Sequence, residues 1–497
     1  MSAIKQLFGQ TLIYGFSSVL ARTLNFLLVP LYTILFIPSE YAVVSEMYAY
    51  AAFLMVLGSC GMETTFFRFT DSQKKEKTQQ TFSTAFFFIF FNSILLITLG
   101  TLFQEQLAGA IRHTKNPEYI TYFIAIISLD LLATIPFALL RQENKAIKFA
   151  MIKTTNILIN IFLNIFFLII CPELLKGDHF SAIIESFYRQ EISVGYVFIS
   201  NLIASGITLI ILLPDIKKNL NTFDFQLFKK MFAYAWPILI AGMAFIINET
   251  ADKILIKYLL PKGIAMRELG IYSACYKLSI FMTLFVQAYR FAAEPFFFNQ
   301  FHRPRAKTLY ATMLDCFVLF ALLIFLFVVL YIDIIKLIIP NQLYHEGIII
   351  IPIVLMANIF LGIYYNLSVW YKVTNKTQYA AIISLLGATI TISLNVLFVP
   401  IYGYIAAAWT TLVCYIVMAA ISFYFGQKFF QIKYNLISIV KHFSVAMFLF
   451  LISKLFNHSY ANIQIDNTVL FLIYLIFMYW QLKKIFLQIT INESQNP

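Results

Sequence analysis

The chain has 497 residues, of which 61% are hydrophobic and only 12% are charged, and its mean hydropathy is +0.80. A soluble domain carries about 25% charged residues, so the composition excludes an ordinary soluble protein and predicts a polytopic membrane protein. The net charge of +12 comes largely from Lys and Arg in the short segments between apolar runs. It therefore indicates topology signals and lipid-headgroup contacts, and not nucleic acid as a partner.

Fourteen apolar segments are long enough to cross a bilayer, which takes about 20 residues. They predict an all-α protein with spans at 8–36, 41–67, 81–103, 119–140, 149–171, 194–213, 229–259, 269–297, 309–332, 347–370, 377–399, 402–425, 436–456 and 467–486. The longest predicted external segment, 172–193, has only about twenty residues. It leaves no room for an extramembrane catalytic domain, which argues against an enzyme.

The first span carries an arginine near its middle and a row of polar residues on one helix face. Thr11, Tyr14, Ser18, Arg22 and Asn25 recur at spacings of three and four. A central arginine costs about 2.5–3.5 kcal/mol on insertion scales, so Arg22 should face protein or water and not lipid. The leucines around this row are predicted to face lipid: Leu27, Leu28 and Leu31.

The charges between the spans predict the orientation. With the amino terminus in the cytoplasm, the cytoplasmic segments carry 23 Lys and Arg residues and the opposite segments carry seven. This bias places both termini in the cytoplasm and supports an even number of spans.

An internal repeat divides the chain. Residues 39–55 align with residues 267–283 at a constant offset of 228, and LNIFF at 163–167 is echoed by LNVLF at 394–398. These echoes predict two parallel-repeat six-helix bundles around a central cavity, with two further helices at the carboxyl end. The predicted divisions are an amino-terminal bundle 1–214, a cytoplasmic connector 215–230, a carboxyl-terminal bundle 231–425 and two additional helices with a tail in 426–497. The connector could form an interfacial amphipathic helix.

The sequence offers no recognised catalytic motif: it has no phosphate-binding loop, no GxGxxG and no HExxH. The five cysteines have no CxxC spacing, and the six histidines are scattered, so neither a metal site nor a cofactor is predicted. Any energy for transport would come from an ion gradient, the membrane potential or the substrate gradient.

Ionisable and amide side chains inside the spans are the functional candidates. We predict that the following residues line a substrate-binding cavity: Arg22, Asn25, Glu46, Asp130, Asn160, Asn164, Asp252, Lys253, Lys277 and Arg290. Asn160 and Asn164 belong to a stripe on span 5 that starts at Lys153 and Asn156. Amides on one helix face can bind sugar hydroxyls, and they can equally hold helices together.

Alternatives stay open for several of these charges. Glu249 with Lys253, and Arg290 with Glu294, are spaced for neutralisation within one helix. Glu63 and Asp315 lie toward the ends of their spans and are expected to be solvated. Arg22 could bind substrate, or it could pair with Asp130 or Glu46 inside the first bundle.

Several motifs in the first two spans resemble one bacterial family. They are Gly9–Gln10, Arg22, VPLYT at 29–33, PSEY at 38–41 and GMETTFFRF at 61–69. They are similar to the amino-terminal helices of bacterial polysaccharide-biosynthesis membrane proteins. These are the O-antigen-type oligosaccharide flippases of the MOP (multidrug/oligosaccharidyl-lipid/polysaccharide) superfamily.

The resemblance implies a transporter in the bacterial cytoplasmic (inner) membrane. Its substrate would be an undecaprenyl-pyrophosphate-linked oligosaccharide, and its other partners would be membrane lipids and a coupling ion, proton or sodium. Other functions stay open: an ion-coupled multidrug exporter of the same architecture, the lipid II flippase, and a polysaccharide polymerase or ligase. Few centred carboxylates and many in-membrane cations argue against a cationic-drug exporter, and the absence of a sizeable external loop argues against a polymerase.

Overall fold

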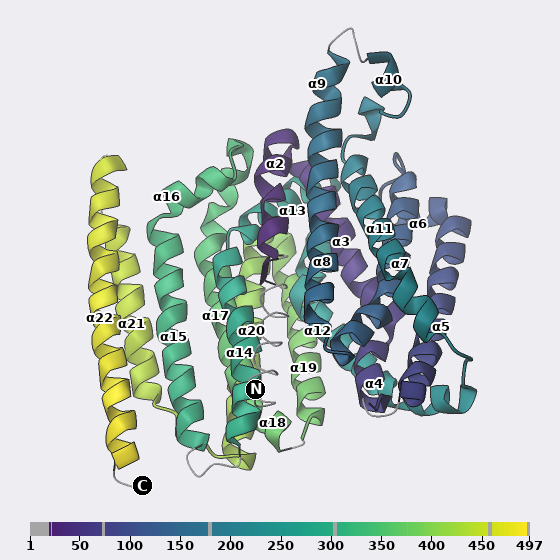
Figure 1. The fold of residues 1–497 in the computed structure, drawn as a ribbon. Helices are drawn as coiled ribbons and strands as arrows, with labels where there is room; N and C mark the ends of the chain where they lie inside the picture. The colour runs from purple at the N-terminus through teal and green to yellow at the C-terminus, as the bar shows by residue number, and fades with distance from the viewer. Residues whose placement is uncertain are drawn as a thin grey trace. The chain divides into compact units, whose positions relative to one another are not determined.

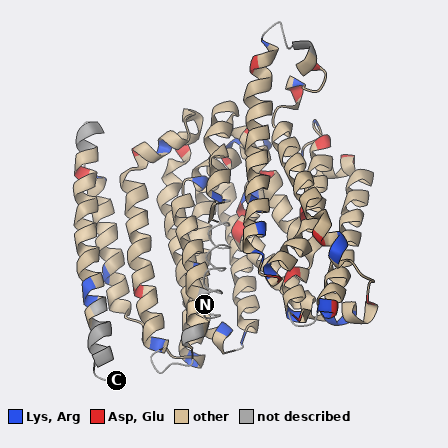
Figure 2. Ribbon diagram, viewed as in Figure 1, with Lys and Arg blue, Asp and Glu red and all other residues tan. Residues whose placement is uncertain are grey.

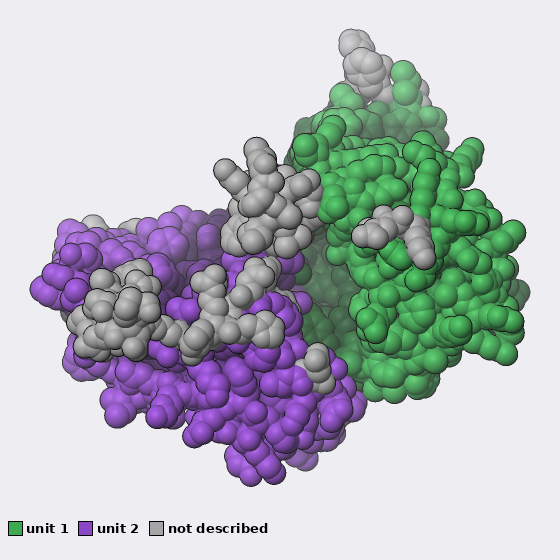
Figure 3. Space-filling model, turned by 60° about the horizontal axis from the view of Figure 1, so that its bottom comes forward, with its two compact units in different colours: residues 1–257 green, residues 258–497 purple. Residues whose placement is uncertain are grey.

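A computed structural model describes residues 19–20, 22–71, 75–176, 181–301, 306–374, 376–455 and 460–494. These residues are almost entirely helical, and no strand occurs among them (Figure 1). The chain divides into two compact units, Met1–Lys257 (unit 1) and Tyr258–Pro497 (unit 2), which Figure 3 distinguishes by colour.

Unit 1 is built mainly from long apolar helices. Its elements are α2 (Leu28–Leu35), α3 (Pro38–Ser59), α4 (Met62–Phe69), α5 (Lys75–Leu102), α6 (Gln104–Ala110), α7 (Glu118–Gln142), α8 (Ala146–Ile165), the π-helical turn η1 (Phe166–Ile170), α9 (Cys171–Leu175), α10 (Ser181–Glu185), the 3₁₀ turn η2 (Gln190–Ile192), α11 (Gly195–Asn219) and α12 (Phe225–Leu259), whose last two residues belong to unit 2.

Unit 2 contains the remaining helices. They are α13 (Lys262–Lys277), α14 (Ile280–Gln300), α15 (Ala306–Leu330), α16 (Ile332–Ile335), the 3₁₀ segments η3 (Lys336–Ile338) and η4 (Gln342–Ile350), α17 (Ile351–Leu367), α18 (Val369–Val373), α19 (Gln378–Tyr402), α20 (Tyr404–Phe429), α21 (Leu436–Ser453) and α22 (Tyr460–Ser494).

Within the described residues, twelve helices are long and apolar enough to cross a membrane. A thirteenth span is obtained if the bent pair α13 and α14, which meet at 54°, counts as one. Each coincides with a predicted span. The first predicted span, 8–36, is described only from residue 19 onward and without residue 21, and it includes a shorter apolar helix, Arg22–Leu35. The total of fourteen therefore stays a prediction, and Thr11, Tyr14 and Ser18 lie outside the described residues.

The second span is interrupted near its end, where two consecutive residues have positive φ angles. Cys60 and Gly61 both have positive φ angles, of 48° and 68°, which separate α3 from α4. A glycine adopts this conformation without a steric penalty. A Cβ at Gly61 would also lie 3.1 Å from the backbone oxygen of Ala235, so the glycine lets α12 pack closely on the break.

Helix α12 packs against the preceding helices of unit 1, including α5. At its start, Gln80 of α5 donates a 2.9 Å hydrogen bond to Asp224, which in turn accepts backbone hydrogen bonds from the first turn of α12. Further along, Phe88 and Phe232 form an edge-to-face ring contact at 6.0 Å. These contacts make the first helix after the connector part of the amino-terminal unit.

The packing order of unit 1 recurs in unit 2. In unit 1, α7 packs against α5 and α11, and α8 packs against α11; in unit 2, α17 packs against α15 and α20, and α19 packs against α20. This order is that expected from a repeated bundle. Helices α21 and α22 pack against α15, outside the repeated part. The residue boundaries of the predicted divisions, and the symmetry that relates the repeats, stay predictions.

Two local expectations are wrong. The connector does not form a separate helix, because α11 continues to Asn219 and α12 begins at Phe225, leaving only five residues outside helices. Leu28 was expected to face lipid, yet it is only 6% exposed, whereas Leu27 is 57% exposed. Periodicity alone placed both on an outer face, but Leu28 packs into the interior.

Candidate functional site

A polar contact joins α2 to α8 inside unit 1. Tyr32 donates its hydroxyl hydrogen to Oδ1 of Asn164, at 2.9 Å, and Asn164 is fully buried. Asn164 donates in turn to the backbone oxygen and side-chain oxygen of Asn160, at 2.8 and 3.0 Å. The stripe predicted on span 5 therefore makes an inter-helix contact and an intra-helix contact, and it fixes the first described helix against the fifth span.

The same region carries a carboxylate and a cation. Asp130 of α7 is half-buried and hydrogen-bonded to Ser205 of α11, and Lys153 of α8 acts on it electrostatically. Tyr48 of α3 accepts a 2.7 Å hydrogen bond from Asn201 of α11. Tyr48 also lies within electrostatic range of both Asp130 and Tyr32.

We call this set the polar face of unit 1: Tyr32, Tyr48, Asp130, Lys153, Asn156, Asn160, Asn164, Asn201, Ser205 and Thr208. Five helices supply it, and Asn156 completes it by donating a 2.9 Å hydrogen bond to Thr208. Tyr48 is 39% exposed and Lys153 is exposed, so part of the face is accessible. Hydroxyls, amides, one carboxylate and one ammonium can together bind sugar hydroxyls or a small cation.

A second polar cluster in unit 1 consists of two buried charged residues and a partly buried histidine. Glu46 of α3 is 0% exposed; its Oε1 pairs with the ammonium of Lys257 on α12, and its Oε2 lies 3.0 Å from Nε2 of His113. The same ammonium donates to the backbone oxygen of Ile111, and Arg112 donates to the backbone oxygen of Lys257 at 3.2 Å. We call Glu46, His113 and Lys257 the Glu46 cluster. It joins α12 to α3 and to the segment between α6 and α7.

The other predicted cavity residues are placed as follows. On α12, Asp252 is 3% exposed and Lys253 is half-buried. Lys277 is exposed at the end of α13, and Arg290 of α14 is exposed and lies over the ring of Tyr365 at 5.0 Å. Arg22 and Asn25 are exposed on the first described helix. The structure thus brings Asp130, Asn160 and Asn164 into one region and puts Glu46 in a separate, buried one. The expectation for Asp315 is wrong, because it is only 8% exposed.

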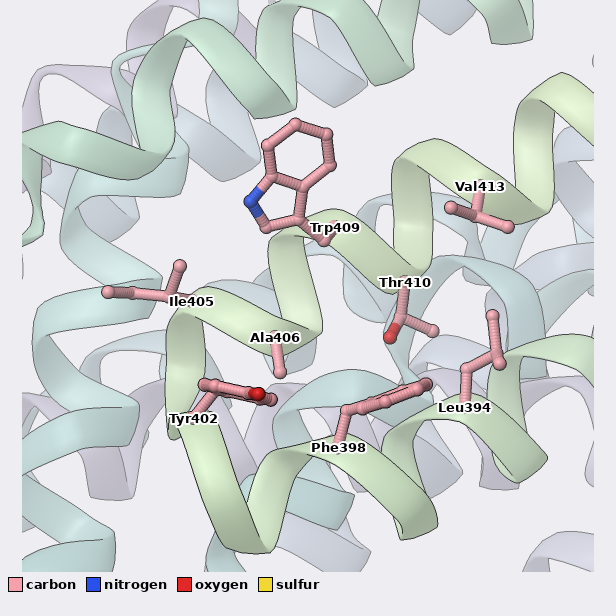
Figure 4. Close-up of a pocket in the computed structure, with 8 residues that line it drawn as sticks. All are labelled: Leu394, Phe398, Tyr402, Ile405, Ala406, Trp409, Thr410 and Val413. Atoms are coloured by element: carbon pink, nitrogen blue, oxygen red, sulfur yellow. The ribbon is translucent and has the colours of Figure 1, made fainter.

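Many charged residues lie toward helix ends, as Figure 2 shows. Figure 4 shows a pocket of about 400 Å³ on unit 2, between α19 and α20. Its lining consists of Leu394, Phe398, Tyr402, Ile405, Ala406, Trp409, Thr410 and Val413. The aliphatic and aromatic lining suits hydrocarbon, and it offers no cation for a phosphate.

Sequence reasoning missed several members of both clusters. Tyr48 lies in the repeated segment 39–55 but was not among the predicted cavity residues, and neither was Lys257. His113 lies in a segment expected to be external. In each case the partner is distant in sequence, 211 residues for Lys257 and Glu46, so local spacing carries no signal of the pair.

With this geometry established, comparison with solved structures defines the class of fold. The lipid II flippase MurJ, in an inward closed conformation, matches with a TM-score of 0.70 and 17% identity, over 95% of this chain and 99% of that one. An inward-facing multidrug resistance MATE family transporter of the MOP superfamily matches with a TM-score of 0.66 and 10% identity, over 85% and 96%. A Vibrio cholerae MATE transporter matches with a TM-score of 0.56 and 15% identity, over 85% and 97%. The chain is thus a multi-pass membrane protein with the fold of MOP-superfamily transporters.

A family model narrows the class further. The model described as "Polysaccharide biosynthesis protein" matches residues 8–301, which is more than half of the chain. The chain belongs to this polysaccharide biosynthesis protein family. The family predicted from the motifs in residues 9–69 is thereby confirmed, as is the all-α membrane fold. No curated protein matches the chain.

Proposed function

We propose that the protein is a flippase for a lipid-linked oligosaccharide. It moves a glycan on an undecaprenyl-pyrophosphate carrier from the cytoplasmic to the external leaflet of the bacterial inner membrane, by alternating access of its two bundles. The observation that carries the proposal is the family match over residues 8–301, joined to a fold shared with a flippase of lipid II.

The polar face of unit 1 supports a sugar as part of the cargo. Its amides and hydroxyls come from several helices, and such groups match the alternating donors and acceptors of a sugar. Asn160 and Tyr48 are only partly buried, so they remain available to a ligand. The lipid chain needs no polar site, since it can remain in the bilayer while the headgroup crosses.

Cations on the first half of the chain support a pyrophosphate headgroup. Arg22 has an exposed side chain in a span, and Lys153 stands at the end of the asparagine stripe. A guanidinium binds phosphate oxygens through a bidentate fork that an ammonium cannot reproduce. In a cell with a negative interior, moving one net negative charge outward gains about 2.3 kcal/mol per 100 mV unless a co-moving ion cancels it.

The test is export of surface polysaccharide in a strain that depends on this protein, with membrane abundance measured in parallel. We expect Arg22→Ala to abolish export at normal abundance. Arg22→Lys should impair export, because a lysine keeps the charge but cannot make the bidentate hydrogen bonds of a guanidinium to phosphate. Arg22→Ala combined with Asp130→Asn distinguishes a structural role. Normal export by Arg22→Ala, or a defect that consists only of lost abundance and is rescued by the second change, would remove Arg22 from the headgroup site.

A second candidate is an ion-coupled multidrug exporter, and the likeness to MATE transporters favours it. The purified chain in vesicles separates the two. A flippase exposes a fluorescent undecaprenyl-pyrophosphate-linked sugar to an external quencher and does not acidify or alkalinise the lumen when cationic drugs are added. Drug-driven ion flux without movement of the lipid-linked sugar would reverse the assignment. The same assay with lipid II tests that flippase activity.

The orientation has its own test. Cysteines placed near Lys75 and Lys217 should react with a membrane-impermeant reagent only from the cytoplasmic side, and one near Lys115 only from outside. The carboxyl terminus should also be cytoplasmic. An external carboxyl terminus would contradict an even number of spans.

A further inference from the structure

A buried polar cluster in unit 2 lies where the two carboxyl-terminal helices pack on the bundle. It consists of Asp315 of α15 with Ser438 and His442 of α21, and we call it the Asp315 cluster. His442 is 0% exposed and Asp315 is 8% exposed. Gln481 of α22 hydrogen-bonds to His442, so three helices meet at this point.

The contacts leave two facing atoms unsatisfied. Nδ1 of His442 lies 3.5 Å from Oδ1 of Asp315, and within the described part of the chain neither atom has a hydrogen-bond partner. The other atoms are partnered: Ser438 donates to Oδ2 of Asp315 at 3.2 Å, and its Oγ lies 3.3 Å from Nε2 of His442. Within the described residues, Nδ1 and Oδ1 are thus the two facing atoms of this cluster that lack a hydrogen bond.

A single proton would neutralise this pair. A carboxylate buried beside a neutral imidazole carries a net negative charge, and a net charge in an apolar interior costs several kcal/mol, on the order of the penalty for one ion. A proton on Oδ1 or on Nδ1 makes one atom a donor and the other an acceptor, and it sets the net charge of the pair to zero. We propose that Asp315 and His442 together form a proton-binding site inside unit 2.

Few other groups compete for this role. In the described residues, the charged group that acts on His442 is Lys441 of the same helix, whose ammonium lies over the ring of Phe477 on α22 at 5.4 Å. On α15 the thiol of Cys316 interacts electrostatically with Asp315. The remaining partners are the neutral hydroxyl of Ser438 and the neutral amide of Gln481. The bound proton is thus controlled chiefly by the pair itself and by one nearby ammonium.

The proton would set how firmly α21 and α22 pack on α15. We call the interface of α21 and α22 with α15 the seam. Its other hydrogen bonds named here do not titrate at ordinary pH: Asn467 donates to the backbone oxygen of Leu330 at 2.7 Å, and Tyr474 donates to the backbone oxygen of Leu319 at 3.1 Å. At the Asp315 cluster, release of the proton leaves a net charge in the seam. The seam therefore has one pH-sensitive contact, which lies at one end of a row of permanent ones.

The site can be tested without any transport assay, so its failure is distinct from failure of the proposed function. The full chain, in lipid nanodiscs and with its histidines labelled with nitrogen-15, is titrated between about pH 3 and 9, a range that covers the usual pKa values of a carboxyl group and of histidine. His442→Gln identifies the His442 signals. We expect both ring nitrogens of His442 to change together in one step, since release of the proton alters either the charge or the tautomer of the ring. Signals that stay constant through this range would overturn the proposal.

Matched variants assign the step to the pair. Asp315→Asn should abolish it, because the imidazolium loses its counter-ion; a step that persists unchanged contradicts a shared proton. Ser438→Ala keeps both titrating groups but removes a hydrogen bond to the carboxylate and the contact with Nε2 of His442, so the midpoint should shift, and an unchanged midpoint also contradicts the site. Tyr474→Phe is the control, since it weakens the seam without touching the pair and should leave the step in place.

Discussion

Each unit buries one carboxylate together with a histidine, and the two sites differ in how completely they are partnered. In unit 1, Glu46 meets an ammonium and an imidazole, and both carboxylate oxygens are engaged. In unit 2, Asp315 meets a serine hydroxyl and an imidazole, and one oxygen lacks a hydrogen bond within the described residues. The Glu46 cluster carries a permanent cation; the Asp315 cluster carries a group whose charge depends on a proton.

This difference separates a structural contact from a switchable one. Lys257 pairs with Glu46 and also donates to the backbone oxygen of Ile111, so it fixes α12 to α3 and to the segment after α6. Asp315 and His442 can hold a proton between them, so the charge at the contact between α21 and α15 can change. A carboxylate near the end of a span can thus be structural or switchable, and its partner decides which.

The largest expected effect comes from removing the cation of the Glu46 cluster. Lys257→Met leaves a buried carboxylate without its ammonium, which should cost about 3–5 kcal/mol in the free energy of unfolding. Reversible denaturation of the purified protein, followed by helical circular dichroism, measures the loss. Lys217→Met is the matched control, because Lys217 is exposed at the end of α11 and its replacement should change little.

The double variant decides whether the cost arises from the pair. Glu46→Gln with Lys257→Met removes both charges and should recover most of the lost stability, because no unpaired ion remains. If the double variant is as unstable as Lys257→Met alone, the lysine stabilises the unit through its other contacts, such as the backbone oxygen of Ile111, and the comparison with unit 2 fails.

The next effect has the opposite sign. Asp315→Leu with His442→Phe replaces the incompletely bonded pair by apolar side chains, which should leave the protein equally stable or more stable by about 1–4 kcal/mol. The same denaturation experiment measures it. A marked loss of stability would mean that the Asp315 cluster is as fully satisfied as the Glu46 cluster, and that the two units do not differ in this respect.

Sequence patterns predicted the spans well and the sites only in part, for a physical reason. Apolar length and loop charge are local properties, so helices such as α7 and α15 could be located from the residues alone. Asn160 and Asn164 were found because a helical stripe is also local. Lys257 and His442 were not singled out, since each depends on a partner more than one hundred residues away. Leu28 failed because periodicity identifies a face but not what covers it.

A smaller effect is expected at the contact between α2 and α8. Tyr32→Phe removes the hydroxyl that donates to Asn164 and leaves the ring in place. Hydrogen bonds between membrane helices contribute about 0.6 kcal/mol on average, and up to about 1.7 kcal/mol, so the loss of stability should fall in that range. The polysaccharide-export assay then distinguishes the two roles of the polar face: reduced export at normal abundance points to substrate contact, and normal export to helix packing alone.

The smallest effect should come from an ion pair that is exposed, and it calibrates the comparison of buried ones. Arg267 and Glu346 form two N–O contacts, of 2.7 and 2.9 Å, but their side chains are 51% and 44% exposed. Water and salt screen such a pair, so Arg267→Gln should cost less than about 1 kcal/mol, and the cost should shrink further as ionic strength rises. Denaturation at low and high salt measures both quantities. For Lys257→Met the loss should depend little on salt, because the Glu46 cluster is shielded from ions in solution; a strong salt dependence there would mean that the cluster is hydrated and not the closed contact described for unit 1.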